Sequence, residues 1–327
     1  MNQFNTILNR RIEELFERKA NAVEKLSEYL HLGNHAIYRR LKGETPFTLE
    51  EACILASKLN ISLDALAFSR DEVALCTPNF YNDQPNSFSK FLKDLLRKFE
   101  SIMHLEDVKM YYTSKGLPFF LYLIQPELLA FKLFVWEVGS WNSDRINGKQ
   151  FDFNMLSTED LMLAKKIYKC YCHIPSFEAW NSAILDSTFE QIQYIDDIGL
   201  FKNRNVKYEL LNALDAVVDR ASKMADAGQK FDTDQQGVSA FHLYHVELLN
   251  STNVTYVTSK QHSFVSWTFC DPDYLVSCDK VLCDRAADWL DSLIKQSSYI
   301  TKNSFRIRNQ YFKGLKQKIE SIQNLSL

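Results

Sequence analysis

A short polar stretch from residue 34 to residue 42 carries side chains that could recognise a nucleic acid. Four of its side chains are spaced by three or four residues, which places them on one face of a helix: His35, Tyr38, Arg39 and Lys42. Asn34 stands at the beginning of that helix, and Arg40 adds further positive charge. Side chains of these types hydrogen-bond to base edges or neutralise phosphates. The stretch therefore predicts a helix that contacts DNA.

Two other groups of side chains resemble metal ligands in type but not in spacing. Cys170, Cys172 and His173 lie on a predicted helix, where residues two apart point in different directions. His242 and His245 lie near a predicted strand, where residues three apart face opposite sides. We therefore expect buried thiols and locally bonded histidines, and no metal site.

Paired carboxylates occur at Asp196-Asp197 and at Asp271-Pro272-Asp273. No general base or nucleophile stands beside them, so we expect them in turns and helix caps. The sequence also lacks a Gly-rich phosphate loop, a Gly-x-Ser-x-Gly elbow and a His-Glu-x-x-His helix. We expect neither an enzyme nor a bound cofactor.

The helix that carries the polar stretch needs a partner helix to hold it. Two helices joined by a tight turn bury a few fixed apolar positions against each other. Leu26, Leu30 and Leu32 meet this need before and within the turn. Ile37 and Leu41, one turn apart, form the inner face of the second helix. This pattern predicts a helix-turn-helix unit.

Further short helices surround this pair. A capping box at Thr48 and Glu51 starts one of them, and Ser62 is placed to cap another. Apolar residues at helical spacing complete the pattern. Five helices are predicted near residues 4–20, 22–30, 34–42, 48–59 and 62–68.

The stretch from Phe4 to Phe68 resembles the Cro/repressor family of helix-turn-helix proteins, also called the xenobiotic-response-element family. The resemblance rests on the five-helix layout and on residues 26–30, 36–43 and 59–64. It implies that the second helix of the motif enters the major groove and that dimers read paired half-sites. It also implies that the base readers are Asn34, His35, Tyr38 and Arg39.

Three residues depart from the family pattern. His31 stands where the family usually has a turn glycine, and Leu41 replaces a common glutamate. Val23 stands where a glutamine often anchors the first motif helix to phosphate. We therefore expect phosphate anchoring from other basic residues, with Arg10, Arg11 and Lys19 as candidates.

The rest of the chain predicts a linker and a larger domain. Residues 73–87 are rich in Pro, Asn and Asp and separate a domain over 1–72 from one over 88–327. A strongly amphipathic helix over 88–103 begins the second domain. Its apolar stripe fits either packing within that domain or a subunit interface.

Helices and strands alternate irregularly in the second domain. Strands are predicted at 108–113, 119–124, 246–249, 253–258 and 263–269, and helices at 126–138, 157–174, 189–201, 206–227, 280–295 and 305–322. The fold class is therefore mainly α with a smaller β part: an N-terminal helix-turn-helix bundle and a helix-rich α+β domain. Residues 116–120 and 126–136 resemble large helix-turn-helix regulators of Bacteroidetes-type bacteria, which implies a bacterial cytoplasmic protein.

The bulk composition sets limits on function. The net charge of −3 gives no global attraction to nucleic acid, so any DNA binding depends on a local basic patch. Nine glycines and seven cysteines fit a helix-rich chain with reduced thiols, and neither a signal peptide nor a membrane helix is expected. We predict a sequence-specific transcriptional regulator that binds double-stranded DNA as a homodimer, with a small-molecule effector possible at the second domain. The alternative is an interaction protein whose helical head docks a protein partner.

Overall fold

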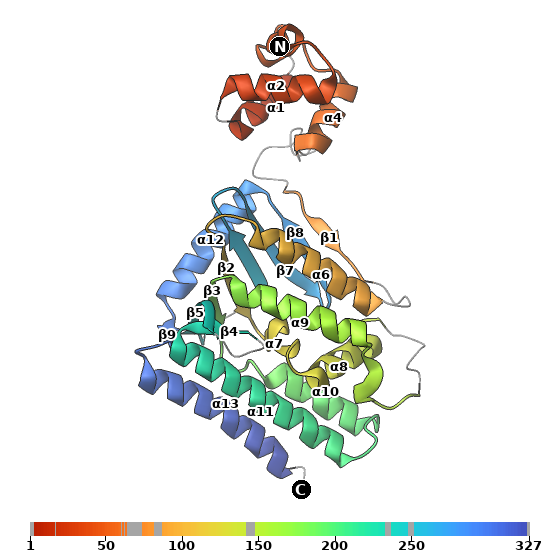
Figure 1. The fold of residues 1–327 in the computed structure, drawn as a ribbon, viewed down its shortest axis with the longest axis vertical. Coiled ribbons are helices and arrows are strands. Elements are labelled where there is room, and N and C mark those ends of the chain that lie inside the picture. Colours follow the sequence, from red (N-terminus) through yellow and green to blue (C-terminus); the bar gives the residue numbers. More distant parts are fainter. Residues whose placement is uncertain are drawn as a thin grey trace. The chain divides into compact units, whose positions relative to one another are not determined.

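The computed structural model describes residues 3–16, 18–59, 61, 63, 74–81, 87–141, 148–232, 237–247 and 252–325. The chain divides into two compact units, residues 1–75 and residues 76–327, where the sequence predicts a first domain over 1–72. Helices dominate both units, and the second also contains a sheet (Figure 1). The prediction of a mainly helical protein with a smaller β part is confirmed.

The first unit, called the head below, is a small helical bundle. Its described helices are α1 (Gln3–Leu15), α2 (Lys19–Leu30), α3 (Asn34–Leu41) and α4 (Leu49–Leu59). Its core consists of apolar side chains from all four helices, of which Leu8, Ile12, Leu26, Ile37 and Leu55 are fully buried. The predicted fifth helix over 62–68 lies, except for Leu63, outside the described residues.

The second unit is built on a mixed sheet that has nine strands in the part of the chain that is described. The strands are β1 (Thr77–Asn79), β2 (Lys109–Ser114), β3 (Ser176–Trp180), β4 (Gln229–Phe231), β5 (Gly237–His245), β6 (Val254–Thr258), β7 (Ser263–Cys270), β8 (Asp273–Ser277) and β9 (Ser298–Tyr299). Their order is β1-β8-β7-β6-β2-β3-β5-β4, and β9 pairs with β5. Strands β2, β3 and β5 are parallel, and the remaining pairs are antiparallel.

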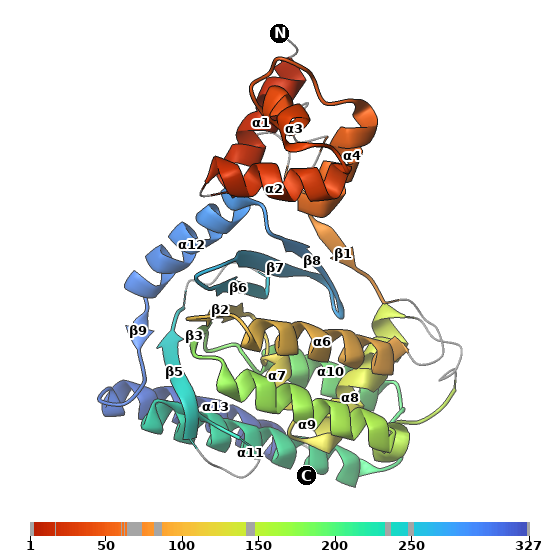
Figure 2. The same cartoon turned by 45° about the horizontal axis from the view of Figure 1, so that its top comes forward.

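Helices cover both faces of this sheet unequally. The described helices are α6 (Ser87–Met103), α7 (Phe119–Tyr122), α8 (Pro126–Val135), η1 (Trp136–Ser140), η3 (Phe153–Met155), α9 (Thr158–His173), α10 (Asp186–Asp197), α11 (Arg204–Ala227), α12 (Lys280–Lys295) and α13 (Phe305–Leu325). Figure 2 shows α6, α9 and α11 on one side of the sheet and α12 on the other. Parallel strands need long crossovers, and here α7 to α9 connect β2 to β3, while α10 and α11 lie between β3 and β5.

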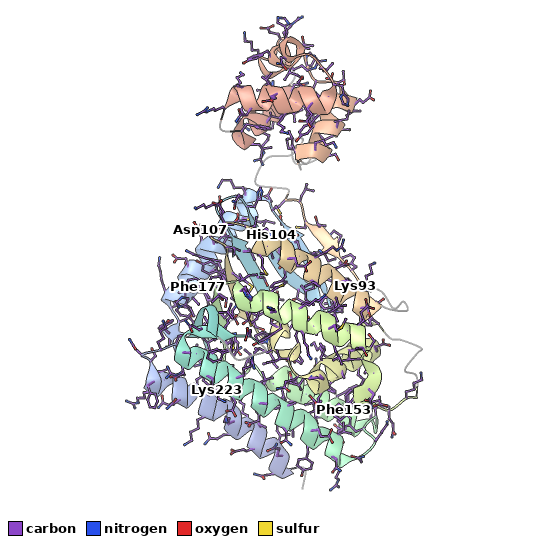
Figure 3. The ribbon with its side chains drawn as sticks, in the orientation of Figure 1. Lys93, His104, Asp107, Phe153, Phe177 and Lys223 are labelled. Atoms are coloured by element: carbon purple, nitrogen blue, oxygen red, sulfur yellow. The ribbon has the colours of Figure 1, made fainter. Side chains whose placement is uncertain are left out.

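Helix α6 packs within its own unit, which decides between the two interpretations of its apolar stripe. Phe88, Phe91 and Phe99 are buried in the large core of the second unit. Lys93 (labelled in Figure 3) lies 2.8 Å from Glu159 at the beginning of α9. The stripe therefore forms core rather than an open subunit interface.

The predicted start of α9 is confirmed in detail. The backbone N–H of Ser157 donates to Asp160 at 3.0 Å, and the backbone N–H of Asp160 donates back to the Ser157 hydroxyl at 3.1 Å. This reciprocal capping box satisfies two N–H groups that the helix itself cannot satisfy.

Two predicted strands are wrong. Residues 119–124 contain the helix α7 after Pro118, because a short apolar run suits a buried helix as well as a strand. Residues 246 and 247 of the strand expected at 246–249 are not in a strand, and residues 248–249 lie outside the described residues. The strand before them is Gly237–His245, where Phe241 and Leu243 are fully buried in the core. Strand β1 occupies Thr77–Asn79 within the predicted linker and pairs with β8.

Candidate nucleic-acid interface

A tight turn joins α2 to α3. His31 closes α2 with a left-handed backbone, φ 52°, and its N–H bonds to the carbonyl of Ser27. The backbone N–H of Leu32 also donates to that carbonyl at 3.3 Å, and the Ser27 hydroxyl donates to the carbonyl of Leu32. Gly33, in an extended conformation, precedes the first residue of α3. These bonds fix the turn that the sequence pattern predicts.

The inner side of α3 is held by the head core. Ile37 is fully buried and Leu41 nearly so, while Leu26 of α2 is fully buried against them. Leu30 and Leu32 pack at the edge of the same cluster. The predicted burial pattern is therefore present, and it fixes which face of α3 points outward.

The outer side of α3 carries the expected polar side chains. Five of the predicted residues are exposed: Asn34, His35, Tyr38, Arg39 and Lys42. Arg39 lies 3.5 Å from Glu44, but both side chains are more than half exposed, so this ion pair contributes little to stability. The two cations, Arg39 and Lys42, therefore remain accessible to an anion such as a phosphate.

Arg40 has a different role from the other predicted residues. Its guanidinium makes two bonds to Glu51 of α4, at 2.9 and 2.7 Å, and both side chains are only 15% exposed. Burial alone would raise the pKa of Glu51, but its hydrogen bonds with Arg40 hold that pKa below the usual value. Arg40 thus ties α3 to α4, and we assign it to positioning rather than to DNA contact.

Glu51 also caps α4, as the sequence predicts. The backbone N–H of Thr48 donates to Glu51 at 2.9 Å, and the backbone N–H of Glu51 donates to the Thr48 hydroxyl at 3.2 Å. The sequence does not predict the additional pairing with Arg40, because the two residues are eleven positions apart and belong to different helices. Within the sequence, only the local capping box signals a role for Glu51.

The departures from the family pattern have local explanations. Val23 is 3% exposed and belongs to the head core, so no polar side chain at this position could reach a phosphate without leaving the core. Among the proposed substitutes, Arg11 pairs with Glu14 and Lys19 pairs with Glu13. Arg10 is exposed and has no ion pair with the described residues.

The cysteines and histidines set aside in the sequence do not gather at a site. Cys172 is fully buried and burial raises the pKa of its thiol to about 11, whereas His173 is exposed. His242 stacks on Phe177 with ring centres 4.6 Å apart (Phe177 is labelled in Figure 3), and His245 contacts the Ser182 hydroxyl at 3.0 Å. Within the described ranges, no three His, Cys, Asp or Glu side chains are placed to bind a metal ion.

The paired carboxylates have structural partners. Asp196 lies 3.0 Å from Lys207, and Asp271 lies 3.0 Å from Lys132. Asp273 accepts a hydrogen bond from the backbone N–H of Tyr81. Each of these three carboxylates joins two segments of the second unit.

None of the helices in the described residues is both long and apolar enough to cross a membrane. Comparison with known proteins gives no match: no family model fits the chain, and no curated protein or solved structure is significantly similar to it.

Proposed function

We propose that the protein is a sequence-specific DNA-binding transcriptional regulator that inserts α3 into the major groove. One observation carries the proposal: α3 buries its apolar face in the head and exposes Asn34, Tyr38 and Arg39 on the other face. The resemblance of the head to the Cro/repressor family supports the same function. We propose a homodimer whose two α3 helices meet half-sites about 34 Å apart.

The exposed side chains suit distinct contacts with DNA. An asparagine amide can pair with adenine, and an arginine can pair with guanine, each through two hydrogen bonds. By this chemistry Asn34 and Arg39 would read bases, His35 and Tyr38 would add further contacts, and Lys42 would neutralise a phosphate. Since the whole chain has a net charge of −3, this attraction is local to α3.

We would test this function by selecting DNA fragments on the purified full chain at near-physiological salt. Wild type should enrich a two-fold symmetric site, and Arg39→Ala should not, because Arg39 is exposed on the outer face of α3. Lys58→Ala is the matched control, since it removes an exposed cation from α4. An absence of enrichment by wild type, or equal enrichment by Arg39→Ala, would contradict the proposal.

A second candidate function is docking of the head on a protein partner. Two apolar side chains of the head favour it, since Leu49 is 76% exposed and Tyr38 is 40% exposed. Leu49→Ser should abolish partner capture but leave DNA selection unchanged if the two functions use different residues. We place either function in the bacterial cytoplasm, in keeping with the resemblance of residues 116–120 and 126–136 to bacterial regulators.

A further inference from the structure

A cavity lies between α6 and the part of the sheet formed by β1, β8, β7, β6 and β2. Its volume is about 790 Å³, and its lining residues lie within the second unit. Cavities that hold small ligands in proteins have volumes of roughly 300–1,000 Å³. The space is therefore large enough for a small organic molecule.

Part of the cavity wall consists of small side chains that the sheet presents to α6. Successive residues of a strand point to opposite faces. On the face toward the cavity stand Thr255, Ser266 and Thr268. On the other face, Tyr256 and Val265 pack against Cys283, Ala286 and Leu290 of α12, with Trp267 at the edge of this cluster. The three small side chains thus leave volume on the α6 side of β6 and β7.

Aromatic side chains form a large part of the remaining wall. Phe91 and Phe99 of α6, Tyr112 of β2, Trp136 of η1 and Phe264 of β7 all line the cavity. Aromatic walls with a few polar groups are typical of sites for small organic ligands. The body of a suitable ligand would accordingly be aromatic or aliphatic.

Among the described residues, one positive charge of the cavity, that of Lys98, forms no ion pair. Lys132 is paired with Asp271, and Arg97 is paired with Asp94. Lys98 donates to Asn79 and to the hydroxyl of Tyr274, both of which are neutral. No carboxylate of the described residues lies within ion-pairing distance of Lys98. Burial lowers the pKa of Lys98, and the negative charge of Asp94 acts in the opposite direction without cancelling this effect.

We propose that this cavity binds a small amphipathic molecule with an aromatic or aliphatic body and one anionic group, such as a carboxylate or sulfonate. The anionic group lies at Lys98, where it replaces the solvation that the ammonium has lost. The body lies along the aromatic wall, over Thr255, Ser266 and Thr268. This binding site is independent of DNA binding; only its use as an effector site rests on the proposed function.

The first test uses two fluorescent probes with a similar aromatic body on the full chain without DNA. The anionic probe is 1-anilinonaphthalene-8-sulfonate, and the neutral probe is N-phenyl-1-naphthylamine. Wild type should bind one equivalent of each. Lys98→Gln should bind the anionic probe about tenfold more weakly and the neutral probe equally well, since it removes only the charge. Lys93→Gln is the matched control, because Lys93 lies on the exposed side of the same helix.

The second test places bulk in the cavity. Ser266→Trp should abolish binding of both probes, because the indole occupies the space that the ligand body needs. The near-ultraviolet circular dichroism of each variant would show that it remains folded. Equal affinity of Lys98→Gln and Lys93→Gln for the anionic probe, unchanged binding by a folded Ser266→Trp, or no binding by wild type would overturn the proposal. Since no DNA is present, none of these outcomes depends on the function of the head.

Discussion

Arg39 and Arg40 are adjacent in the sequence, but their side chains have different surroundings. Arg39 is more than half exposed, whereas Arg40 is held by two bonds to Glu51. Helical periodicity shows that neighbouring residues point about 100° apart, but it does not show which residue meets a partner from another helix. The sequence could therefore predict the basic character of α3 but not the distinct role of Arg40.

The different surroundings of the two arginines predict different effects of alanine. Arg40→Ala should lower the free energy of unfolding of the head by about 1–3 kcal/mol, because it leaves a largely buried Glu51 without its charged partner. Arg39→Ala should change it by less than about 0.5 kcal/mol, since an exposed pair contributes little. Urea unfolding followed by far-ultraviolet circular dichroism measures both. Equal destabilisation by the two variants would refute the structural role of Arg40.

Lys42 offers a test of phosphate contact that does not depend on sequence recognition. Lys42→Ala should lower the slope of log affinity against log salt by about 1, because one fewer counterion is released from DNA. The selected site and a scrambled site should show the same change in a fluorescence anisotropy titration. Lys58→Ala should leave the slope unchanged. A slope that Lys42→Ala does not alter would place this side chain away from the DNA backbone.

Lys230 is a fully buried cation whose charge makes stability depend on pH. Its ammonium donates to the carbonyls of Tyr171 and Ile174, at 3.0 and 2.8 Å, where α9 ends. Burial lowers the pKa of Lys230 to about 7, although Glu178 and Cys172 act in the opposite direction. The sequence could not predict this group, because a lysine within a polar segment is ordinarily exposed.

The direction of the pH effect follows from proton binding. Between pH 7 and the ordinary lysine pKa, the unfolded chain holds a proton that folded Lys230 lacks, so the free energy of unfolding rises with pH. The slope from this group is at most about 1.4 kcal/mol per pH unit. The free energy of unfolding of the second unit, measured with urea, should rise more between pH about 7 and about 9 in wild type than in Lys230→Met. Parallel changes in the two proteins would contradict the assignment.

At the scale of elements, helices were easier to predict than strands. The capping boxes at Thr48 and Ser157 depend on residues three apart, so the sequence showed them directly. The sequence does not predict β3, because its pairing partners β2 and β5 are distant in the sequence. It does not predict β8 either, although β8 pairs with β7, the strand directly before it. Strand β3 also contains Glu178, which is fully buried but accepts hydrogen bonds from the Tyr171 and Ser176 hydroxyls and from the Trp180 indole. A buried charge with such partners has no local signature.

The turn between α2 and α3 predicts a stabilising substitution. His31 has φ 52°, a left-handed conformation that costs a residue with a Cβ about 1–2 kcal/mol. His31→Gly removes this strain but increases the conformational entropy of the unfolded chain. The free energy of unfolding of the head should therefore rise by about 0.5–1 kcal/mol. His31→Ala is the matched control, since it shortens the side chain and keeps the strain. A gain from alanine equal to that from glycine would show that the side chain, and not the backbone, is responsible.

At the scale of the whole molecule, the two units have separate hydrophobic cores. The buried core of the head consists of residues between Leu8 and Leu55, and those of the second unit lie between Tyr81 and Ile319. No described buried residue belongs to both. The composition of the whole chain does not indicate this division, because the net charge of −3 is the sum of a basic α3 and acidic segments elsewhere. The boundary between the units is predicted only by the polar segment near residues 73–87.

Separate cores predict that the two units unfold independently. All five tryptophans lie in residues 76–327, so tryptophan fluorescence reports on the second unit alone, while far-ultraviolet circular dichroism reports on both. Urea unfolding should therefore give two transitions by circular dichroism and one by fluorescence. Arg40→Ala should move only the transition that fluorescence does not detect, because its partner Glu51 belongs to the head. If Arg40→Ala shifts the fluorescence transition as much as the circular dichroism transition, the two units unfold as one cooperative body. In that case a ligand that stabilises the cavity beside Lys98 would also stabilise the head.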